Sequence, residues 1–208
     1  GDSLLSGSFV VSGHCRARIE AVGEEMEQEE LEEKPIMELD YPETELIFYD
    51  DFKEREFTAK FLGIHDDSII LDKTTFYPEG GGQPADLGQL FINDETIPII
   101  HTEKVNNIVL HKVDTEKVDI NSLKPFIGEE ISGSIDWNRR IELARNHTAT
   151  HLIIASARKI LGNHIWQAGA QKGVDRSRID LAHYKRITLD ELNQIEALAN
   201  QYVMDNID

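Results

Sequence analysis

Two histidines lie four residues apart in the segment Asn146–His151, which reads NHTATH. On an α-helix, side chains at this spacing project from one face, one turn apart, and a helix can supply two imidazoles to a zinc ion in this way. His147 and His151 are therefore candidate metal ligands, although two partly buried histidines with ordinary hydrogen bonds would give the same pattern. Thr148 stands where a metalloprotease has its general-base glutamate, which argues against a peptidase.

A second candidate for chemistry is the glycine-rich segment Thr74–Pro84, which reads TTFYPEGGGQP. Gly80, Gly81 and Gly82 give the backbone access to positive φ and allow another chain or a ligand to come close. The aromatic and proline residues before them indicate a loop that is held in place. No Gly-Lys-Ser/Thr follows, so the segment is not a phosphate-binding P-loop, and it does not fit a dinucleotide fingerprint. A tight turn between two strands is the alternative interpretation.

Charge is unevenly distributed along the chain, whose formal net charge is −18. Residues 24–45 hold eleven acids and one base, whereas residues 138–186 hold ten Lys and Arg against three acids. Because phosphate binding depends on local cationic surface, the basic C-terminal part can contact RNA despite the acidic total. Two solvated faces of opposite charge would give the same distribution.

Hydrophobic runs, the N-terminal residues and the cysteine count indicate the cellular compartment in which the protein works. No run approaches the roughly 18 apolar residues of a membrane span, and the N-terminus has no basic stretch followed by an apolar core, as a secretory signal would. The single cysteine, Cys15, excludes an intramolecular disulfide and fits a reducing environment. We therefore expect a cytoplasmic protein with no membrane partner.

Short strands separated by turns are expected between residues 46 and 137. Asp66-Asp67 and Asn93-Asp94 are plausible turns. Ile131, Gly133, Ile135 and Trp137 alternate with polar residues, as a half-buried strand requires. The expected strands are Glu56–Ile64, Ser68–Leu71, Gln89–Ile92, Thr96–Ile100, Ile108–Val113 and Glu130–Trp137. Their number and length predict a small barrel or sandwich.

The hydrophobic period changes after Trp137. Asn138–Leu161 predicts a helix, with Gly162 at the position of a C-terminal cap. Its expected buried stripe comprises Leu143, Ile153, Ala157 and Ile160. Two strands, Ile165–Ala170 and Arg178–Leu181, are expected to flank the polar turn Gln171–Ser177. Thr188 and Glu191 have capping-box spacing and predict a final helix.

These patterns together predict an α+β fold. We expect an N-terminal extension and acidic linker over residues 1–45, with a β-like run at Ser8–Val22. A small β-barrel that carries the glycine motif follows over residues 46–137. Residues 138–208 are expected to place helices on an antiparallel sheet.

The motifs resemble one known family. The glycine segment is similar to the glycine motif of alanyl-tRNA synthetase editing domains and of their stand-alone AlaX-type relatives, and the histidine segment resembles the first zinc half-site of that family. The similarity extends over Glu45–Asp208. The matching segments are Thr75–Pro84 with Asp86-Leu87-Gly88, Arg140 with Asn146–Leu152, Gln167-Ala168-Gly169 and Arg178–Leu181.

This resemblance implies a function. Alanyl-tRNA synthetases join alanine to tRNA with ATP and Mg²⁺, in a domain that would lie outside this chain, and their editing domain hydrolyses tRNA(Ala) mischarged with serine or glycine. Editing is needed because an apolar pocket rejects an added hydroxyl by only ~10²-fold. The expected partner is therefore mischarged tRNA(Ala) and not DNA.

The resemblance also implies roles for single residues. Thr75 and Gln83 would line the catalytic pocket, with the Thr75 hydroxyl engaging the serine side chain, and Gly80, Gly81 and Gly82 would admit the terminal adenosine. His147 and His151 would bind Zn²⁺, which orients or polarises the ester or activates a water. Candidates for phosphate contacts, unless they are solvated or paired with acids, are Arg139, Arg140, Arg145 and Arg178.

The sequence departs from the family at two places. Ala170 stands where the family commonly has a serine. The second zinc half-site, a Cys-x-x-x-His motif after the last helix, is missing, and His14-Cys15 has the wrong spacing to replace it. We interpret the chain as truncated after Asp208 and expect it, in isolation, to bind zinc poorly and to be inactive.

Three alternatives stay open at this point. A free-standing AlaX-type deacylase would have the same motifs, although such proteins commonly begin close to the barrel. A tRNA-binding module without hydrolysis would account for the basic half. An unrelated zinc hydrolase would account for the histidines but not for the glycine motif.

Overall fold

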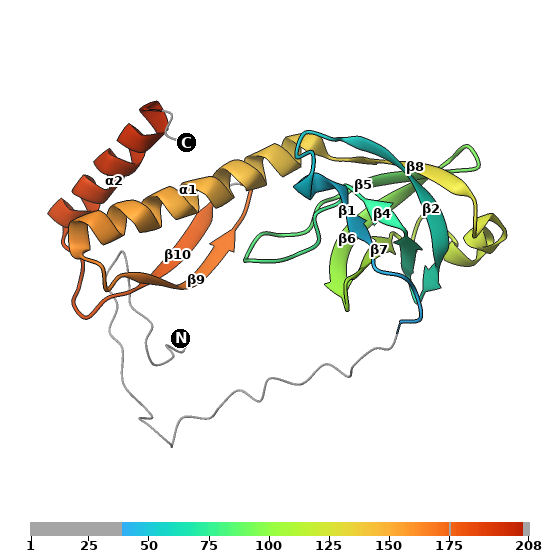
Figure 1. Cartoon of the computed structure of the whole chain (residues 1–208), viewed down its shortest axis with the longest axis horizontal. Coiled ribbons are helices and arrows are strands. Elements are labelled where there is room, and N and C mark those ends of the chain that lie inside the picture. Colours follow the sequence, from blue (N-terminus) through green and yellow to red (C-terminus); the bar gives the residue numbers. More distant parts are fainter. Residues whose placement is uncertain (1–38, 175, 206–208) are drawn as a thin grey trace, which may run out of the picture. The chain divides into compact units, whose positions relative to one another are not determined.

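The computed structural model describes residues 39–174 and 176–205 (Figure 1). The β-like run predicted at Ser8–Val22, most of the acidic linker and His14-Cys15 lie outside these residues. The chain divides into two compact units. We call the described part of the first, residues 39–143, the barrel unit, and that of the second, residues 144–174 and 176–205, the hairpin unit. The division falls inside a helix.

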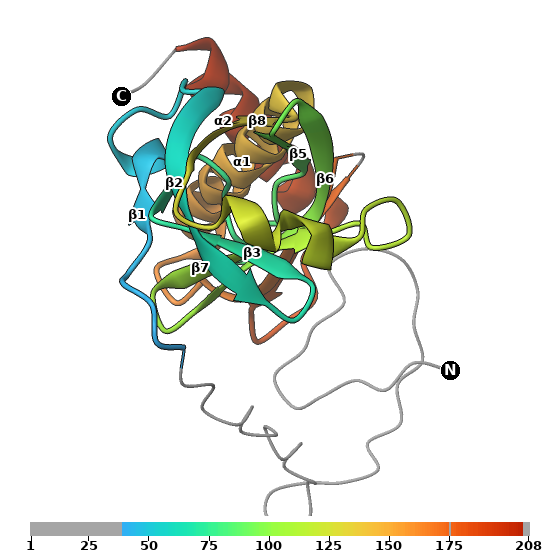
Figure 2. The same ribbon diagram turned by 90° about the vertical axis from the view of Figure 1, so that its right-hand side faces the viewer.

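The barrel unit is a closed antiparallel barrel, seen end-on in Figure 2. Its strands follow the order β2-β3-β7-β6-β5-β8, and β8 pairs with β2 to close it. The predicted small barrel is thereby confirmed. The strands are β2 (Glu56–His65), β3 (Ser68–Leu71), β5 (Gly88–Ile92), β6 (Glu95–Val105), β7 (Ile108–Val113) and β8 (Glu130–Ile135). Because the barrel is closed, each of the six strands pairs with two neighbours, and none is an edge strand.

The barrel core follows from side-chain alternation. Ile131, Gly133 and Ile135 of β8 are buried, as their period-2 spacing predicts. The main buried cluster comprises Phe57, Ala59, Phe61, Ile69, Leu71, Phe76, Leu90, Ile92, Ile97, Ile99, Val113, Ile120, Leu123, Ile131 and Ile135. Short elements complete the unit: β1 (Glu45–Leu46), parallel to β4 (Lys73–Thr74), and the 3₁₀ turns η2 (Ile47–Tyr49) and η3 (Ile120–Phe126).

The turns agree in part with expectation. Asp66, Asn93 and Asp94 have positive φ, so both predicted turns are confirmed. A further turn at Asn106-Asn107, with φ of 49° and 66°, was not predicted. Strand β6 therefore runs to Val105, beyond the predicted end at Ile100. The polar residues after Ile100 extend the strand because each pairs with buried β7 across the ladder.

Helix α1 (Trp137–Leu161) confirms the predicted long helix. Strand β8 ends before Asp136, not at Trp137, because the Asp136 carboxylate accepts the Arg139 N–H at 3.1 Å and so caps the helix. Gly162, at φ 115°, ends it as expected. The predicted stripe is wrong at Ile153, which is exposed, whereas Ile154 is buried. At 3.6 residues per turn, Ile153 lies about 80° from the face of Leu143.

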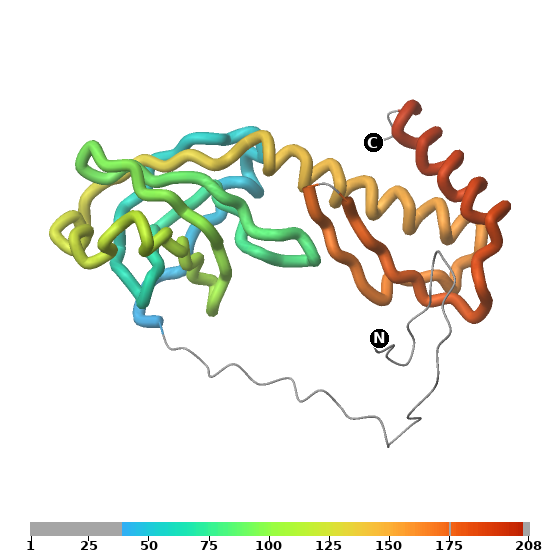
Figure 3. The backbone as a smooth tube through the Cα atoms, turned by 180° about the vertical axis from the view of Figure 1, so that it is seen from behind, coloured from blue at the N-terminus to red at the C-terminus, as the bar shows by residue number. Residues whose placement is uncertain are grey.

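The hairpin unit contains the rest of α1, the antiparallel pair β9 (Trp166–Lys172) and β10 (Ser177–Ala182), and helix α2 (Leu189–Met204). Figure 3 traces this order in the orange and red parts of the chain. Ile154 and Ala157 of α1, Ile195 of α2, and Ile165 and Leu181 form one small core. The capping box predicted at Thr188 and Glu191 is confirmed. The fold class is mixed α+β, as expected.

Within the described ranges, no helix combines the length and the apolar character that crossing a membrane would require.

Candidate functional site

The tip of the glycine segment is a tight turn. Gly80 and Gln83 exchange two backbone hydrogen bonds, of 3.1 and 2.9 Å. Gly81 and Gly82 between them have φ of 59° and 74°. Two consecutive positive φ values are what a type I′ turn requires, and glycine adopts them without strain. The alternative of a tight turn is therefore correct for the local shape, and the backbone of Gly81 and Gly82 is exposed.

Both residues of this segment that were predicted to line a catalytic pocket, Thr75 and Gln83, are buried. The Thr75 hydroxyl has no hydrogen-bond partner among the described residues. A buried hydroxyl without a partner costs about 1–3 kcal/mol relative to one that is paired. This hydroxyl, fully buried in the present structure, would gain a hydrogen bond from any polar group that reached it.

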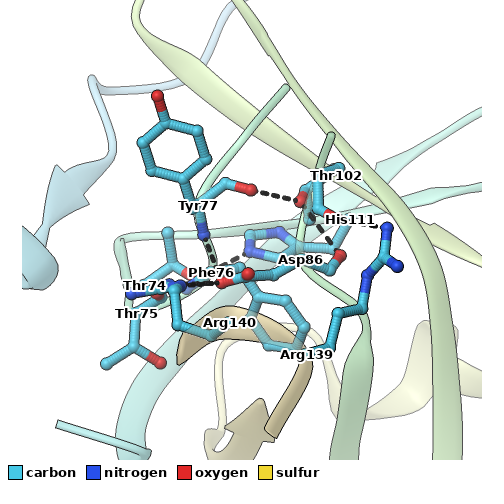
Figure 4. Close-up of polar contacts among 10 residues, drawn as sticks. Thr74, Thr75, Phe76, Tyr77, Asp86, Thr102, His111, Arg139 and Arg140 are labelled. Atoms are coloured by element: carbon cyan, nitrogen blue, oxygen red, sulfur yellow. Dashed lines mark hydrogen bonds and ion pairs between the residues drawn. The ribbon is translucent and has the colours of Figure 1, made fainter. Parts of the chain in front are cut away.

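A buried ion pair holds the segment in place (Figure 4). Arg140, on α1, donates from Nε to Asp86 Oδ2 at 2.7 Å, and its Nη2 also contacts that oxygen. The same Nη2 donates to the Thr75 carbonyl at 2.5 Å. Asp86 Oδ2 further accepts the Tyr77 N–H at 2.9 Å, and the Thr102 hydroxyl donates to the Tyr77 carbonyl at 3.1 Å. Arg140 and Asp86 are each 1% exposed, so the pair is inaccessible to phosphate.

Arg140 was predicted either to contact phosphate or to be solvated or paired with an acid. The structure shows that it is paired with an acid. Asp86 belongs to the motif, but no role was predicted for it. The only feature of the sequence that could indicate a buried role for Asp86 is its position among apolar and glycine neighbours. The partner lies 54 residues away and could not be inferred.

A second buried polar group, the imidazole of His111 on β7, lies beside the start of the glycine segment. Its Nε2 is 2.9 Å from Thr74 Oγ1, and its Nδ1 is 3.1 Å from the Ile69 carbonyl. Burial lowers the pKa of His111 to about 4, although the hydrogen bond to Ile69 acts in the opposite direction. His111 is therefore neutral near pH 7. It was not predicted, because it occupies an ordinary strand position.

The other candidate arginines differ in their surroundings. Arg139 Nη2 lies 3.5 Å from the Ala85 carbonyl, at the limit of a hydrogen bond. Arg145 is exposed on α1. Arg178 is exposed on β10 and pairs with Asp180 at 2.7 Å, which raises the pKa of Arg178. Arg145 and Arg178 therefore lie on the surface, where phosphate can reach them.

The two histidines of α1 have the arrangement that their spacing predicts. The rings of His147 and His151 stack, with centroids 5.2 Å apart and an interplanar angle of 17°. The pKa of His147 is lowered, first by partial burial and then by the charges of Lys172 and His151. A lowered pKa favours the neutral imidazole, which is the form that binds metals.

Two imidazoles on one face fit part of a zinc site. Among residues 39–174 and 176–205 there is no group of three or more His, Cys, Asp or Glu side chains that could hold a metal ion. Lys172, almost fully buried on β9, is near His147, and burial lowers the pKa of this lysine. The described residues therefore supply two of the ligands that a tetrahedral zinc ion needs.

Comparison with known proteins identifies relatives. A family model described as tRNA synthetases class II (A) matches residues 13–139. The alanine–tRNA ligase of Methanobrevibacter smithii is 58% identical over 186 residues, which is 88% of this chain and 20% of that protein. That of Methanosphaera stadtmanae is 56% identical, over 91% of this chain and 21% of that protein. The alanine–tRNA ligase of Pyrococcus abyssi is 44% identical, over 88% of this chain and 20% of that protein. The chain spans about a fifth of the length of these relatives.

Proposed function

The chain belongs to the family of class II (A) tRNA synthetases, and we propose that it is a segment of an alanine–tRNA ligase that edits tRNA(Ala) mischarged with serine or glycine. In the complete enzyme, ATP and Mg²⁺ would serve alanine ligation in a domain outside this chain. The proposed partner of the segment is the mischarged tRNA. The names of the similar proteins support the ligase, and the glycine segment supports the editing step.

The observation that carries the editing proposal is the Thr75 hydroxyl, which is buried and has no partner among the described residues. Serine differs from alanine by one hydroxyl. A site with an unpaired hydrogen-bonding group gains a bond from serine and leaves that group unpaired with alanine. Sites of this kind discriminate by ~10⁴–10⁵-fold, whereas an apolar pocket achieves only ~10²-fold against an added hydroxyl. Thr75 therefore supplies selectivity for Ser-tRNA that an alanine pocket cannot.

The neighbouring residues have complementary roles in this proposal. Gln83, buried beside the turn, has a side-chain amide that can donate to the ester carbonyl and accept from the α-amino group of the aminoacyl substrate. The exposed backbone of Gly81 and Gly82 lets the terminal adenosine approach without side-chain obstruction. The surface guanidiniums of Arg145 and Arg178 are suited to phosphate contacts, which add sequence-independent affinity for RNA.

His147 and His151 would hold zinc, together with ligands outside the described residues. Bound zinc would supply a Lewis acid, which orients or polarises the ester or lowers the pKa of a water. The stacked rings and the lowered pKa of His147 suit these residues to metal binding. The contribution of the two residues is to present two imidazoles on one helix face.

The test is a set of substitutions in the complete ligase. His147→Ala or Gln83→Ala should lower hydrolysis of Ser-tRNA(Ala) by ~10–100-fold, because the first removes a proposed zinc ligand and the second a proposed hydrogen bond to the aminoacyl ester. Alanine activation should remain within about twofold of the unsubstituted enzyme, because the activation site lies elsewhere. Single-turnover deacylation and ATP–pyrophosphate exchange measure the two activities.

His65→Gln is the matched control, since this partly exposed histidine on β2 has no role in the proposal. Undiminished Ser-tRNA hydrolysis in both His147→Ala and Gln83→Ala would contradict the editing function. A protein that retains tRNA in a filter assay but never deacylates it would be a binding module.

A further inference from the structure

We propose that Thr74 and His111 are positioning residues that fix the Thr75 hydroxyl and thereby set the preference for serine over glycine. The inference rests on the proposed editing function and extends it to residues outside the pocket. Thr74, Thr75 and His111 are each fully buried in the barrel unit. Neither Thr74 nor His111 needs to touch the substrate.

The direction of each hydrogen bond follows from the donors and acceptors present. The Ile69 carbonyl can only accept, so His111 Nδ1 carries the proton and donates to it at 3.1 Å. In the neutral ring, Nε2 is then an acceptor, so the Thr74 hydroxyl donates to it at 2.9 Å. The Thr74 oxygen keeps lone pairs and accepts the Phe76 N–H at 3.1 Å. We call these hydrogen bonds, from the Phe76 N–H through Thr74 and His111 to the Ile69 carbonyl, the relay. Each polar side-chain atom in the relay has a hydrogen-bond partner.

The relay brackets Thr75 from both sides. Thr74 ties its own side chain to the Phe76 N–H, so the two peptide groups around Thr75 are held together. Arg140 holds the Thr75 carbonyl at 2.5 Å. The Phe76 ring packs edge-on against His111, with ring centroids 5.4 Å apart. The backbone on both sides of Thr75 is therefore held by hydrogen bonds, and this backbone sets where the buried hydroxyl lies (Figure 4).

A consequence for specificity follows. Hydrolysis of Ser-tRNA depends on where the Thr75 hydroxyl lies, whereas glycine has no side chain to meet it. A displacement of about 1 Å in a positioning group can lower a rate by ~10²-fold. Loss of the relay should therefore lower Ser-tRNA hydrolysis more than Gly-tRNA hydrolysis. General destabilisation of the barrel would lower both to the same extent.

Thr74→Val is the decisive variant, because valine has the shape of threonine but removes the hydroxyl. It leaves His111 Nε2 and the Phe76 N–H without partners. In the complete ligase, we expect the ratio of kcat/KM for Ser-tRNA(Ala) to that for Gly-tRNA(Ala) to fall ~10-fold or more. Thr74→Ser retains the hydroxyl and should restore the ratio to within about threefold. His111→Gln should act in the same direction as Thr74→Val.

Thr58→Val is the control, since Thr58 is exposed on β2 of the same barrel. Equal losses for both substrates, or an unchanged ratio, in Thr74→Val would refute the positioning role. If the unsubstituted ligase failed to hydrolyse Ser-tRNA at all, the proposed function itself would be refuted.

A second measurement does not depend on activity. Nitrogen NMR of the 208-residue chain should show His111 as the Nδ1–H tautomer, and Thr74→Val should speed exchange of the Phe76 amide ~10-fold or more. A His111 that carries its proton on Nε2, or a Phe76 amide that is unchanged in the variant, would overturn the relay.

Discussion

The barrel unit and the hairpin unit differ in how completely they bury their side chains. The barrel closes on itself around a large core. The hairpin unit has a small core and only two strands. Several of its large apolar side chains are exposed in the described structure, namely Trp166 at 61%, Tyr184 at 75%, Leu189 at 75%, Val203 at 60% and Met204 at 83%.

This difference has a physical consequence for the candidate residues in each unit. Thr75 and Gln83 belong to the closed unit, where buried hydrogen bonds from Thr74 to His111 and from Arg140 to the Thr75 carbonyl hold the backbone in place. His147 and His151 belong to the unit that has the smaller buried core. Burial of apolar surface stabilises the folded state by roughly 25 cal/mol per Å². A two-stranded hairpin is marginal by itself and depends on the helices packed against it. The barrel unit should therefore be the more stable of the two.

The largest expected effect comes from removing one partner of the buried pair. Asp86→Asn or Arg140→Met should destabilise the barrel unit by ~3–5 kcal/mol, because the remaining charge stays buried without compensation. Urea unfolding followed by Trp137 fluorescence, in a Trp166→Phe background, reports on the barrel, since Trp137 packs against its core.

The matched control is Asp67→Asn, which breaks the exposed pair of Asp67 and Lys112 at 2.8 Å. An exposed pair contributes only ~0–1 kcal/mol. Similar losses for the buried and the exposed pair would show that burial does not set the strength of these contacts.

The next effect concerns pH and His111. The pKa of His111 is about 4 in the folded barrel and 6.5 in the unfolded chain, because burial disfavours the imidazolium. Between these values the unfolded state binds more protons, so stability is lost as pH falls below 6.5. The loss should reach about 3 kcal/mol by pH 4. It should be absent from the pH dependence of His111→Gln.

The comparison is made between variants, since carboxylates titrate over the same range. If His111→Gln lost stability between pH 6.5 and pH 4 as steeply as the unsubstituted chain, the folded-state pKa of His111 would not be low.

The smallest effect tests the hairpin unit. Thr188→Ala removes the side chain that accepts the Glu191 N–H at the start of α2 and should cost about 1 kcal/mol. Hydrogen exchange of the α2 amides should accelerate about fivefold, while amides of the barrel strands should not change. Thr188→Ser retains the cap and should behave like the unsubstituted chain. Equal acceleration in both units would show that they unfold together, and would contradict the higher stability of the barrel unit.

Much of the local structure was predictable. Alternation of apolar residues located the barrel strands, and the 3.6-residue period located α1. Gly162 and the pair Thr188 and Glu191 marked helix ends correctly, because caps depend on a few adjacent residues. The error at Ile153 arose because α1 has apolar residues at consecutive positions, and only packing selects which of them is buried.

The sequence by itself determined the elements, their approximate limits and the family resemblance that marks Thr75 and His147. Those features depend on residues within a few positions of one another. Only the tertiary structure decided that Arg140 pairs with Asp86, across 54 residues, and that His111 meets Thr74, across 37. An arginine or a strand histidine has the same local pattern whether it is solvated or buried. Its role is fixed by barrel closure, because closure removes water and leaves other protein groups as the available partners.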